Sequence, residues 1–266
     1  TINGGGNNLT ITGNLNVDNA ISNTAIFYVS GTTDLGANVT TSGTQTYSGA
    51  VTLSGAARTL TTTGDNVTFS STVNGAQDLT VDTTNSGGSS AATVQFGGVV
   101  GGTTPVGAII ITGNLNLDGN IIKTSDSTAG ATSVAVSGTS DLGANVKTTG
   151  NQTYTGNTTV SADITLTGGA QLTFGGTVNS SSTDSASDTD NLSTVFTETE
   201  FDGIVGGTYG LGAIIITGAL DLDANITSAT SLSVSTTSNL GADVTTSGTQ
   251  TYSGAVTLSA DNVLTT

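Results

Sequence analysis

Residues 11–21 read ITGNLNVDNAI, and nearly the same wording returns at 111–121 as ITGNLNLDGNI and at 216–226 as ITGALDLDANI. Within each copy, apolar residues stand two apart with a polar residue between them, as in Leu115 and Leu117. That spacing is typical of a strand with one buried face. A chain that repeats such strands predicts stacked structural units instead of a single globular core.

Two further blocks return in step with the first. They are residues 34–53, 141–160 and 239–258, and residues 96–111 and 201–216. The long period is therefore roughly 100 to 107 residues. We divide the chain into long repeats at approximately 11–110, 111–215 and 216–266, the last of them partial.

A shorter period of roughly 20 residues lies inside each long one, which is the length of one coil of a parallel β-helix. The sequence therefore predicts an all-β fold, one continuous β-solenoid over residues 1–266, with about five coils in each long repeat. Gly and Asn are expected at the corners, where Asn14 and Asn114 would form side-chain ladders if the neighbouring coils carry Asn too. The polar stretches near 85–92 and 180–191 are expected to protrude as loops.

Composition excludes several classes of protein. Thr and Val dominate over helix formers, and only 8% of residues are charged, so we expect almost no helix. The formal charge of -16 arises from nineteen acidic residues against Arg58, Lys123 and Lys147, which makes nucleic acid and anionic membranes poor partners. The chain has no Cys and no His, so disulfides and imidazole catalysis are excluded. The longest apolar run, around 109–111, is too short for membrane insertion.

Acidic residues gather in one part of the chain and could bind Ca²⁺ through hard oxygen ligands. These candidates are Asp184, Asp188, Asp190, Glu198, Glu200 and Asp202. A solvated loop is the favoured interpretation, because neither an EF-hand spacing nor a calcium-binding nonapeptide repeat is present. The recurring Asp18, Asp118 and Asp223 are predicted to lie five coils apart and to cap corners. No other cofactor is expected.

Three further residue types need an interpretation. Tyr47, Tyr154 and Tyr252 recur in one block and are expected in the core or at a corner. Thr-x-Thr steps at 10–12, 44–46 and 61–63 suggest an ice-binding face, but such a face requires the step on every coil. Carboxylate pairs could serve a carbohydrate-active enzyme, yet three dispersed basic residues and no His argue against catalysis.

Residues 43–53 and 248–258 (GTQTYSGAVTL) and residues 66–81 (NVTFSSTVNGAQDLTV) resemble the repeat regions of filamentous-haemagglutinin-like exoproteins. The resemblance implies a right-handed parallel β-helix, secretion across a bacterial outer membrane, and a role in adhesion, aggregation or biofilm.

We therefore expect no enzyme, but the structural shaft of a secreted bacterial surface adhesin or extracellular fibre. The alternative is a subunit of a self-assembled filament or sheath. Identical copies, associating end to end or laterally, are the expected partners, together with a host or neighbouring cell surface.

Overall fold

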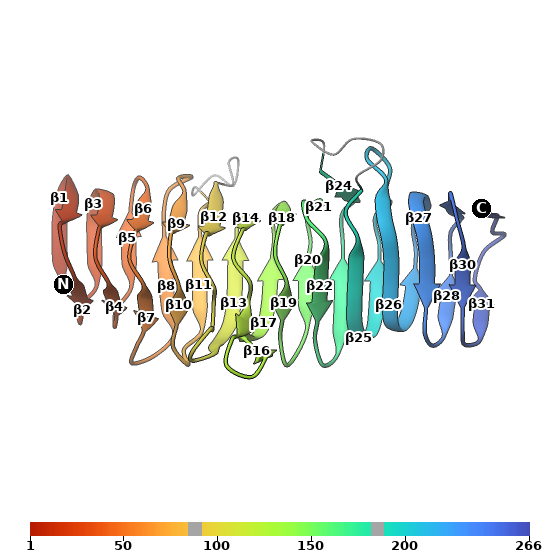
Figure 1. Ribbon diagram of the computed structural model, residues 1–266. Coiled ribbons are helices and arrows are strands. Elements are labelled where there is room, and N and C mark those ends of the chain that lie inside the picture. Colours follow the sequence, from red (N-terminus) through yellow and green to blue (C-terminus); the bar gives the residue numbers. More distant parts are fainter. Residues whose placement is uncertain (85–91, 182–188) are drawn as a thin grey trace. The chain divides into compact units, whose positions relative to one another are not determined.

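The computed structural model describes residues 1–84, 92–181 and 189–266. All regular structure in these ranges is β-strand, and they contain no helix that could cross a membrane. The chain divides into two compact units, residues 1–138 and 139–266, and each is described by itself (Figure 1). In both units successive coils stack through parallel strands, which confirms the predicted β-solenoid fold class.

The strands are short, and most belong to one coil each. In the first unit they are β1 (Ile2–Ile11), β2 (Leu15–Val17), β3 (Ile21–Val29), β4 (Thr33–Leu35), β5 (Val39–Thr41), β6 (Gln45–Tyr47), β7 (Val51–Leu53), β8 (Arg58–Thr61), β9 (Val67–Phe69), β10 (Val73–Asn74), β11 (Leu79–Asp82), β12 (Thr93–Phe96), β13 (Val106–Thr112), β14 (Asn114–Leu117), β15 (Ile122–Lys123), β16 (Thr128–Ala129) and β17 (Ala131–Val136). In the second unit they are β18 (Ser140–Leu142), β19 (Val146–Lys147), β20 (Gln152–Tyr154), β21 (Thr158–Val160), β22 (Ile164–Thr167), β23 (Gln171–Phe174), β24 (Val178–Ser180), β25 (Leu192–Phe201), β26 (Leu211–Leu222), β27 (Ile226–Val234), β28 (Ser238–Leu240), β29 (Val244–Thr246), β30 (Gln250–Tyr252), β31 (Val256–Leu258) and β32 (Leu264–Thr265).

The coils of the first unit have three faces. Face A carries β5, β8, β11 and β13, face B carries β6, β9, β12 and β14, and face C carries β2, β4, β7 and β10. One column of paired residues on face C consists of Leu15, Thr33, Val51, Val73, Val100 and Ile121. The spacing between its successive members confirms a coil of roughly 20 residues, with one longer coil between Val73 and Val100.

Each inward position stacks on the inward position of the next coil, which produces continuous columns of apolar side chains. On face B the rings of Tyr47, Phe69 and Phe96 lie nearly parallel, with centroids 5.2 and 5.1 Å apart. In the second unit Tyr154, Phe174 and Phe201 stack in the same way, at 5.6 and 5.3 Å. All of these rings are fully buried, and each stacked pair contributes roughly 0.5–1.5 kcal/mol beyond the area it buries.

Asparagine side chains carry the hydrogen-bond ladder across the corners. The carbonyl of Asn38 accepts the N–H of Ile21 in the previous coil at 3.0 Å, and its Oδ1 accepts the N–H of Thr59 in the next coil, also at 3.0 Å. Asn14 Oδ1 likewise accepts the N–H of Thr32 at 3.0 Å. The next coil carries Thr32 and not an Asn opposite Asn14, so the condition for an Asn ladder is not met there, and the amide satisfies the backbone of that coil.

Buried Gln and Thr close the corners from the inside. Gln45 Nε2 donates to the carbonyls of Val39 and Thr61, at 3.2 and 2.9 Å, while Gln45 Oε1 accepts the hydroxyl of Tyr47 at 3.0 Å. The block at 152–154 repeats this network, with Tyr154 donating to Gln152 at 3.1 Å. Burial raises the pKa of both tyrosines. The core position predicted for Tyr47 and Tyr154 is confirmed, and Tyr252 is half-buried.

The long repeat does not correspond to a whole number of coils. Ile11 pairs through five coils with Leu117 on face B. Its sequence counterpart Ile111 lies on face A, in the column of Ile21. The expectation of about five coils per long repeat is confirmed, but the repeat ends one face before the fifth coil is complete because the coils of this unit differ in length.

The second unit shows the same displacement. Gln152 and Gln250 begin equivalent QTY blocks, but Gln152 pairs with Leu172 and Gln250 pairs with Leu232, in separate columns. Successive copies of a block therefore lie on different faces. The strand pattern tolerates this because every face requires the same alternation of inward apolar and outward polar residues.

A buried hydroxyl without a hydrogen-bond partner among the described residues recurs directly before one repeated block, the block at 34–53, 141–160 and 239–258. The residues that carry it are Thr33, Ser140 and Ser238, and the hydroxyl of Thr158 is also buried without a partner.

We predict that Thr33→Val stabilises the fold by about 1 kcal/mol, since the methyl group that replaces the hydroxyl needs no hydrogen-bond partner. Thr52→Val, on the outward side of β7, should change stability by less than about 0.5 kcal/mol. Urea unfolding midpoints measure both, and a loss for Thr33→Val would contradict this prediction.

The Gln45 network predicts strong coupling between two side chains. Gln45→Leu removes the acceptor of the buried Tyr47 hydroxyl and the hydrogen bonds from Gln45 Nε2 to two carbonyls, and it should cost about 3 kcal/mol, whereas Tyr47→Phe should cost about 1 kcal/mol. The double variant should cost less than the sum, because a phenylalanine ring needs no acceptor. Additive free energies of unfolding would show that the two side chains do not share a network.

Candidate functional site

Three carboxylates of the second unit converge at one corner. Glu200, Asp202 and Asp223 each place a carboxylate oxygen within 4.8 Å of the other two. Glu200 lies near the end of β25, Asp202 directly follows β25, and Asp223 directly follows β26. The parallel register pairs Phe201 with Leu222, so the two corner aspartates come from equivalent positions of neighbouring coils. Like charges are therefore stacked on like charges.

Two more carboxylates surround this triad. Asp221 pairs with Glu200 across the strands, and Glu198 lies two residues before Glu200 on the same outward side. Gln171 Nε2 donates to Glu200 Oε2 at 2.9 Å and to Glu198 Oε2 at 3.4 Å. Thr173 Oγ1 donates to the same Glu200 oxygen at 3.0 Å. Neutral donors, not cations, thus hold Glu200 in place.

These surroundings raise the pKa of Glu200 above its ordinary value of 4.5. Partial burial is the largest cause, and the charges of Asp202, Asp221 and Glu198 act in the same direction. The hydrogen bond from Thr173 opposes the shift. The cluster can therefore take up a proton, and its oxygens are also the ligand type that divalent cations such as Ca²⁺ prefer.

Only part of the predicted calcium set comes together here. Glu200 and Asp202 belong to the triad, and Glu198 lies beside it. Asp190 lies elsewhere and accepts a hydrogen bond from Ser180 Oγ at 3.1 Å. Asp184 and Asp188 lie outside the described residues, as does most of each predicted loop near 85–92 and 180–191. Calcium binding at this corner stays a prediction.

Asp221 and Asp223 complete the cluster but were absent from the predicted set. A usable signal was present, since Asp221 follows Glu200 and Asp223 follows Asp202 at the same spacing, which is close to the coil period. The long repeat instead relates Asp223 to Asp18 and Asp118. In the first unit Asp18 follows β2 on face C and Asp118 follows β14 on face B, so these two occupy different corners.

A shallow groove of about 680 Å³ lies beside the triad's strands, at another corner of the second unit. It is lined by Gly168, Gly169, Val195, Phe196, Thr197, Thr217, Gly218, Ala219, Ser235, Thr236 and Thr237. Phe196 is buried against Gly168, and Gly218 adopts a φ of 137° that favours glycine. None of the lining residues titrates, so the groove offers hydroxyls and an apolar floor but no acid or base.

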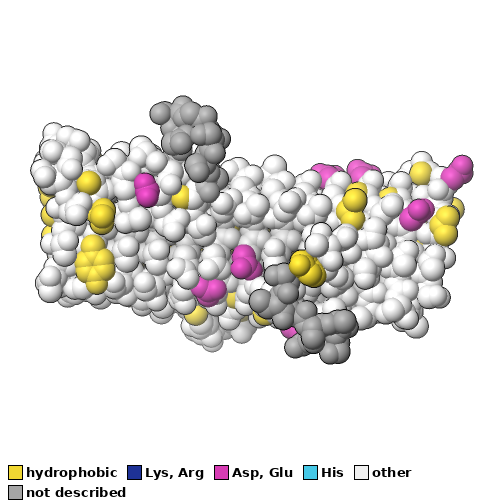
Figure 2. All heavy atoms as spheres, turned by 90° about the horizontal axis from the view of Figure 1, so that it is seen from above, with side chains coloured by type: hydrophobic (Ala, Val, Ile, Leu, Met, Phe, Trp, Pro, Cys, Tyr) yellow, Lys and Arg dark blue, Asp and Glu magenta, His cyan; other side chains and the backbone are white. Residues whose placement is uncertain are grey.

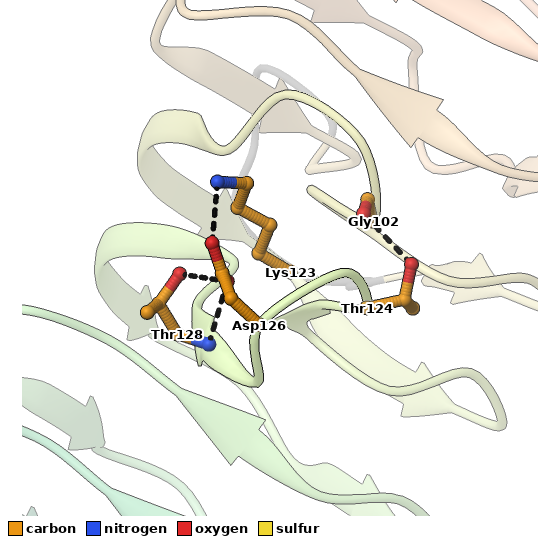
Figure 3. A network of polar contacts seen from close by, with 5 residues as sticks. All are labelled: Gly102, Lys123, Thr124, Asp126 and Thr128. Carbon is orange, nitrogen blue, oxygen red and sulfur yellow. Dashed lines mark hydrogen bonds and ion pairs between the residues drawn. The ribbon is translucent and has the colours of Figure 1, made fainter.

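A small hairpin interrupts the solenoid of the first unit, with β15 and β16 as its antiparallel strands (Figure 3). Lys123 Nζ and Asp126 Oδ2 form an ion pair of 2.7 Å, and Thr128 donates its N–H and hydroxyl to Asp126 Oδ1. These bonds, led by the one from Lys123, lower the pKa of Asp126 to about 2. Thr124 Oγ1 anchors the hairpin to the carbonyl of Gly102 at 2.9 Å. The sequence contains a signal for this insertion, because the segment 121–136 is longer than the matching segment 226–234 of the next long repeat.

On the face drawn in Figure 2, neutral polar side chains and backbone predominate and apolar side chains lie singly. The fold and this surface define a parallel β-solenoid repeat protein. No family model, curated protein sequence or solved structure matches the chain. Functional assignment therefore depends on the structure's own features.

The raised pKa of Glu200 predicts that mild acid stabilises the second unit. The folded state holds the proton more tightly than the unfolded chain, so stability should rise as pH falls from neutral through the folded pKa toward 4.5. Glu200→Gln should flatten this rise, and Asp202→Asn should move it to lower pH. Thermal unfolding across pH measures the effect, and superimposable profiles for the variants and the wild type would contradict it.

Proposed function

We propose that this chain is a structural shaft of a secreted bacterial surface adhesin or extracellular fibre. The observation that carries the proposal is the support of each interior coil by its neighbours. Stacked rings such as Tyr47, Phe69 and Phe96 fill the inside, and Asn38 and Gln45 close the corners between coils. Such an arrangement distributes stability along the stack without a central globular core.

The surface supports the same proposal. Thr, Ser and Asn cover the outward positions, and the net charge of -16 disfavours close approach of copies in water. The repeat wording that resembles filamentous-haemagglutinin-like exoproteins adds secretion and adhesion to the proposal. In this assignment the shaft extends and presents other parts of a larger protein.

A self-assembled filament or sheath is the second candidate. Val256, Leu258 and Leu264 are 43%, 60% and 48% exposed, although their counterparts one coil earlier are buried. These side chains and the open strand edges fit a further coil. In a shaft that coil belongs to the same chain. In a filament it belongs to an identical copy.

We assign neither catalysis nor ice binding to the described residues. The carboxylate cluster sits on an open corner, and the groove beside β25 contains no titratable side chain. An ice face needs long outward columns of Thr. The column through Thr46 and Thr68 changes to Gln95 on the next coil and has Tyr28 on the previous one.

Electron microscopy of the native material, with antibodies raised against this chain, tests the proposal. We expect thin rods at the cell surface, each attached by one end and labelled along its length. Long labelled filaments built by end-to-end contact of many copies would favour the second candidate. Label confined to the cell interior would overturn both.

A further inference from the structure

Several exposed asparagines begin an Asn-x-Thr triplet. They are Asn8, Asn38, Asn66, Asn151, Asn157 and Asn225. Asn-x-Thr is the acceptor sequence for N-linked glycosylation. Because Thr and Asn are abundant in this chain, the triplets by themselves carry no argument. Their geometry in the coil does.

The polar residues of these triplets face outward from a strand. All but Asn8, which lies within β1, directly precede a strand. Asn38 and Thr40 are exposed, and Val39 between them is fully buried. Side chains of a strand alternate between its two sides, so the amide and the hydroxyl lie on the same solvent-facing side. These are the two groups that a glycosyltransferase must reach.

The two ends of each amide have different roles. Oδ1 of Asn38, Asn66 and Asn225 accepts a backbone N–H of the next coil at 3.0, 2.9 and 3.0 Å. Asn8, Asn151 and Asn157 do the same at 3.2, 3.3 and 3.1 Å. The Nδ2 atoms of all these residues make no hydrogen bond within the described ranges. The carbonyl of the amide is thus fixed to the protein, which leaves its nitrogen for solvent.

We propose that the Asn-x-Thr asparagines, namely Asn8, Asn38, Asn66, Asn151, Asn157 and Asn225, are acceptor sites for N-linked sugar. The donor is a sugar activated at C1 by a phosphate-linked carrier, and a separate glycosyltransferase catalyses the transfer. Nδ2 attacks C1, the bond from C1 to the carrier oxygen breaks, and the carrier leaves as a phosphate with the electron pair. The Nδ2 proton passes to a base of the transferase. Oδ1 is unchanged, so the hydrogen bond to the next coil survives modification.

Other asparagines provide matched controls within the chain. Asn14 is exposed and holds Thr32 of the next coil at 3.0 Å, but Asn16 stands where the triplet needs a hydroxyl. Asn191 begins the triplet NLS at 191–193, but its Nδ2 donates to Asp163 Oδ1 at 2.9 Å. Asn14 therefore has the geometry without the triplet, and Asn191 has the triplet without a free amide nitrogen.

Peptide mapping of the native protein by mass spectrometry is the first test. We expect a hexose or N-acetylhexosamine on the Asn-x-Thr asparagines, and none on Asn14 or Asn191. Unmodified peptides at all the predicted sites would overturn the proposal without affecting the proposed shaft function. Equal occupancy at Asn191 would overturn the role given to the free amide nitrogen.

A second test uses the purified folded chain with UDP-glucose and a soluble glycosyltransferase that modifies Asn-x-Thr. Thr40→Val should abolish transfer to Asn38 and leave Asn66 unaffected. Asn16→Thr should create transfer to Asn14, where the wild-type chain shows none. Urea unfolding of each variant checks that the fold is intact. Failure of Asn16→Thr to gain a sugar, with transfer to Asn38 retained, would overturn the link between this corner geometry and modification.

Discussion

Every residue of a parallel solenoid lies beside its counterpart one coil later, at the strand spacing of about 4.8 Å. This constraint makes each side chain the principal neighbour of a similar one. Where the side chains are aromatic, as at Tyr47 and Phe69, stacking stabilises the core. Where they are acidic, as at Asp202 and Asp223, the same register places charge against charge. One geometric rule therefore produces both stabilising and destabilising columns of the molecule.

The same constraint explains the chemistry of the corners. A parallel ladder needs donors and acceptors to meet at each coil, but the backbone turns away at a corner and leaves N–H groups unpaired. Asn side chains on the outside accept these N–H groups, as Asn38 Oδ1 does for the N–H of Thr59. Gln side chains on the inside donate to carbonyls, as Gln45 Nε2 does to the carbonyl of Thr61. Asn is thus frequent at corners for a backbone reason, and it does not need another Asn beside it.

The fold could be predicted because strand alternation and the coil period are visible in one sequence. Leu115 and Leu117, two apart in the printed chain, are both buried on face B. The candidate site was harder, since it depends on register between coils. Glu200 stands out in the sequence because its neighbours are acidic, whereas its partner Asp221 lies one coil later. The hairpin at 122–129 escaped prediction because its polar residues resemble any corner of this chain.

The mismatch between repeat and coil has a consequence for how such a chain can grow. A duplicated block of DNA encoding one long repeat would add strands that fit the stack, although the new copy begins on another face. Ile11 and Ile111 already show this within one unit. A receptor or antibody that recognises the outward side of one copy would then find the next copy turned to a different direction. Changes in copy number would alter the directions in which an epitope points, as well as how many epitopes there are.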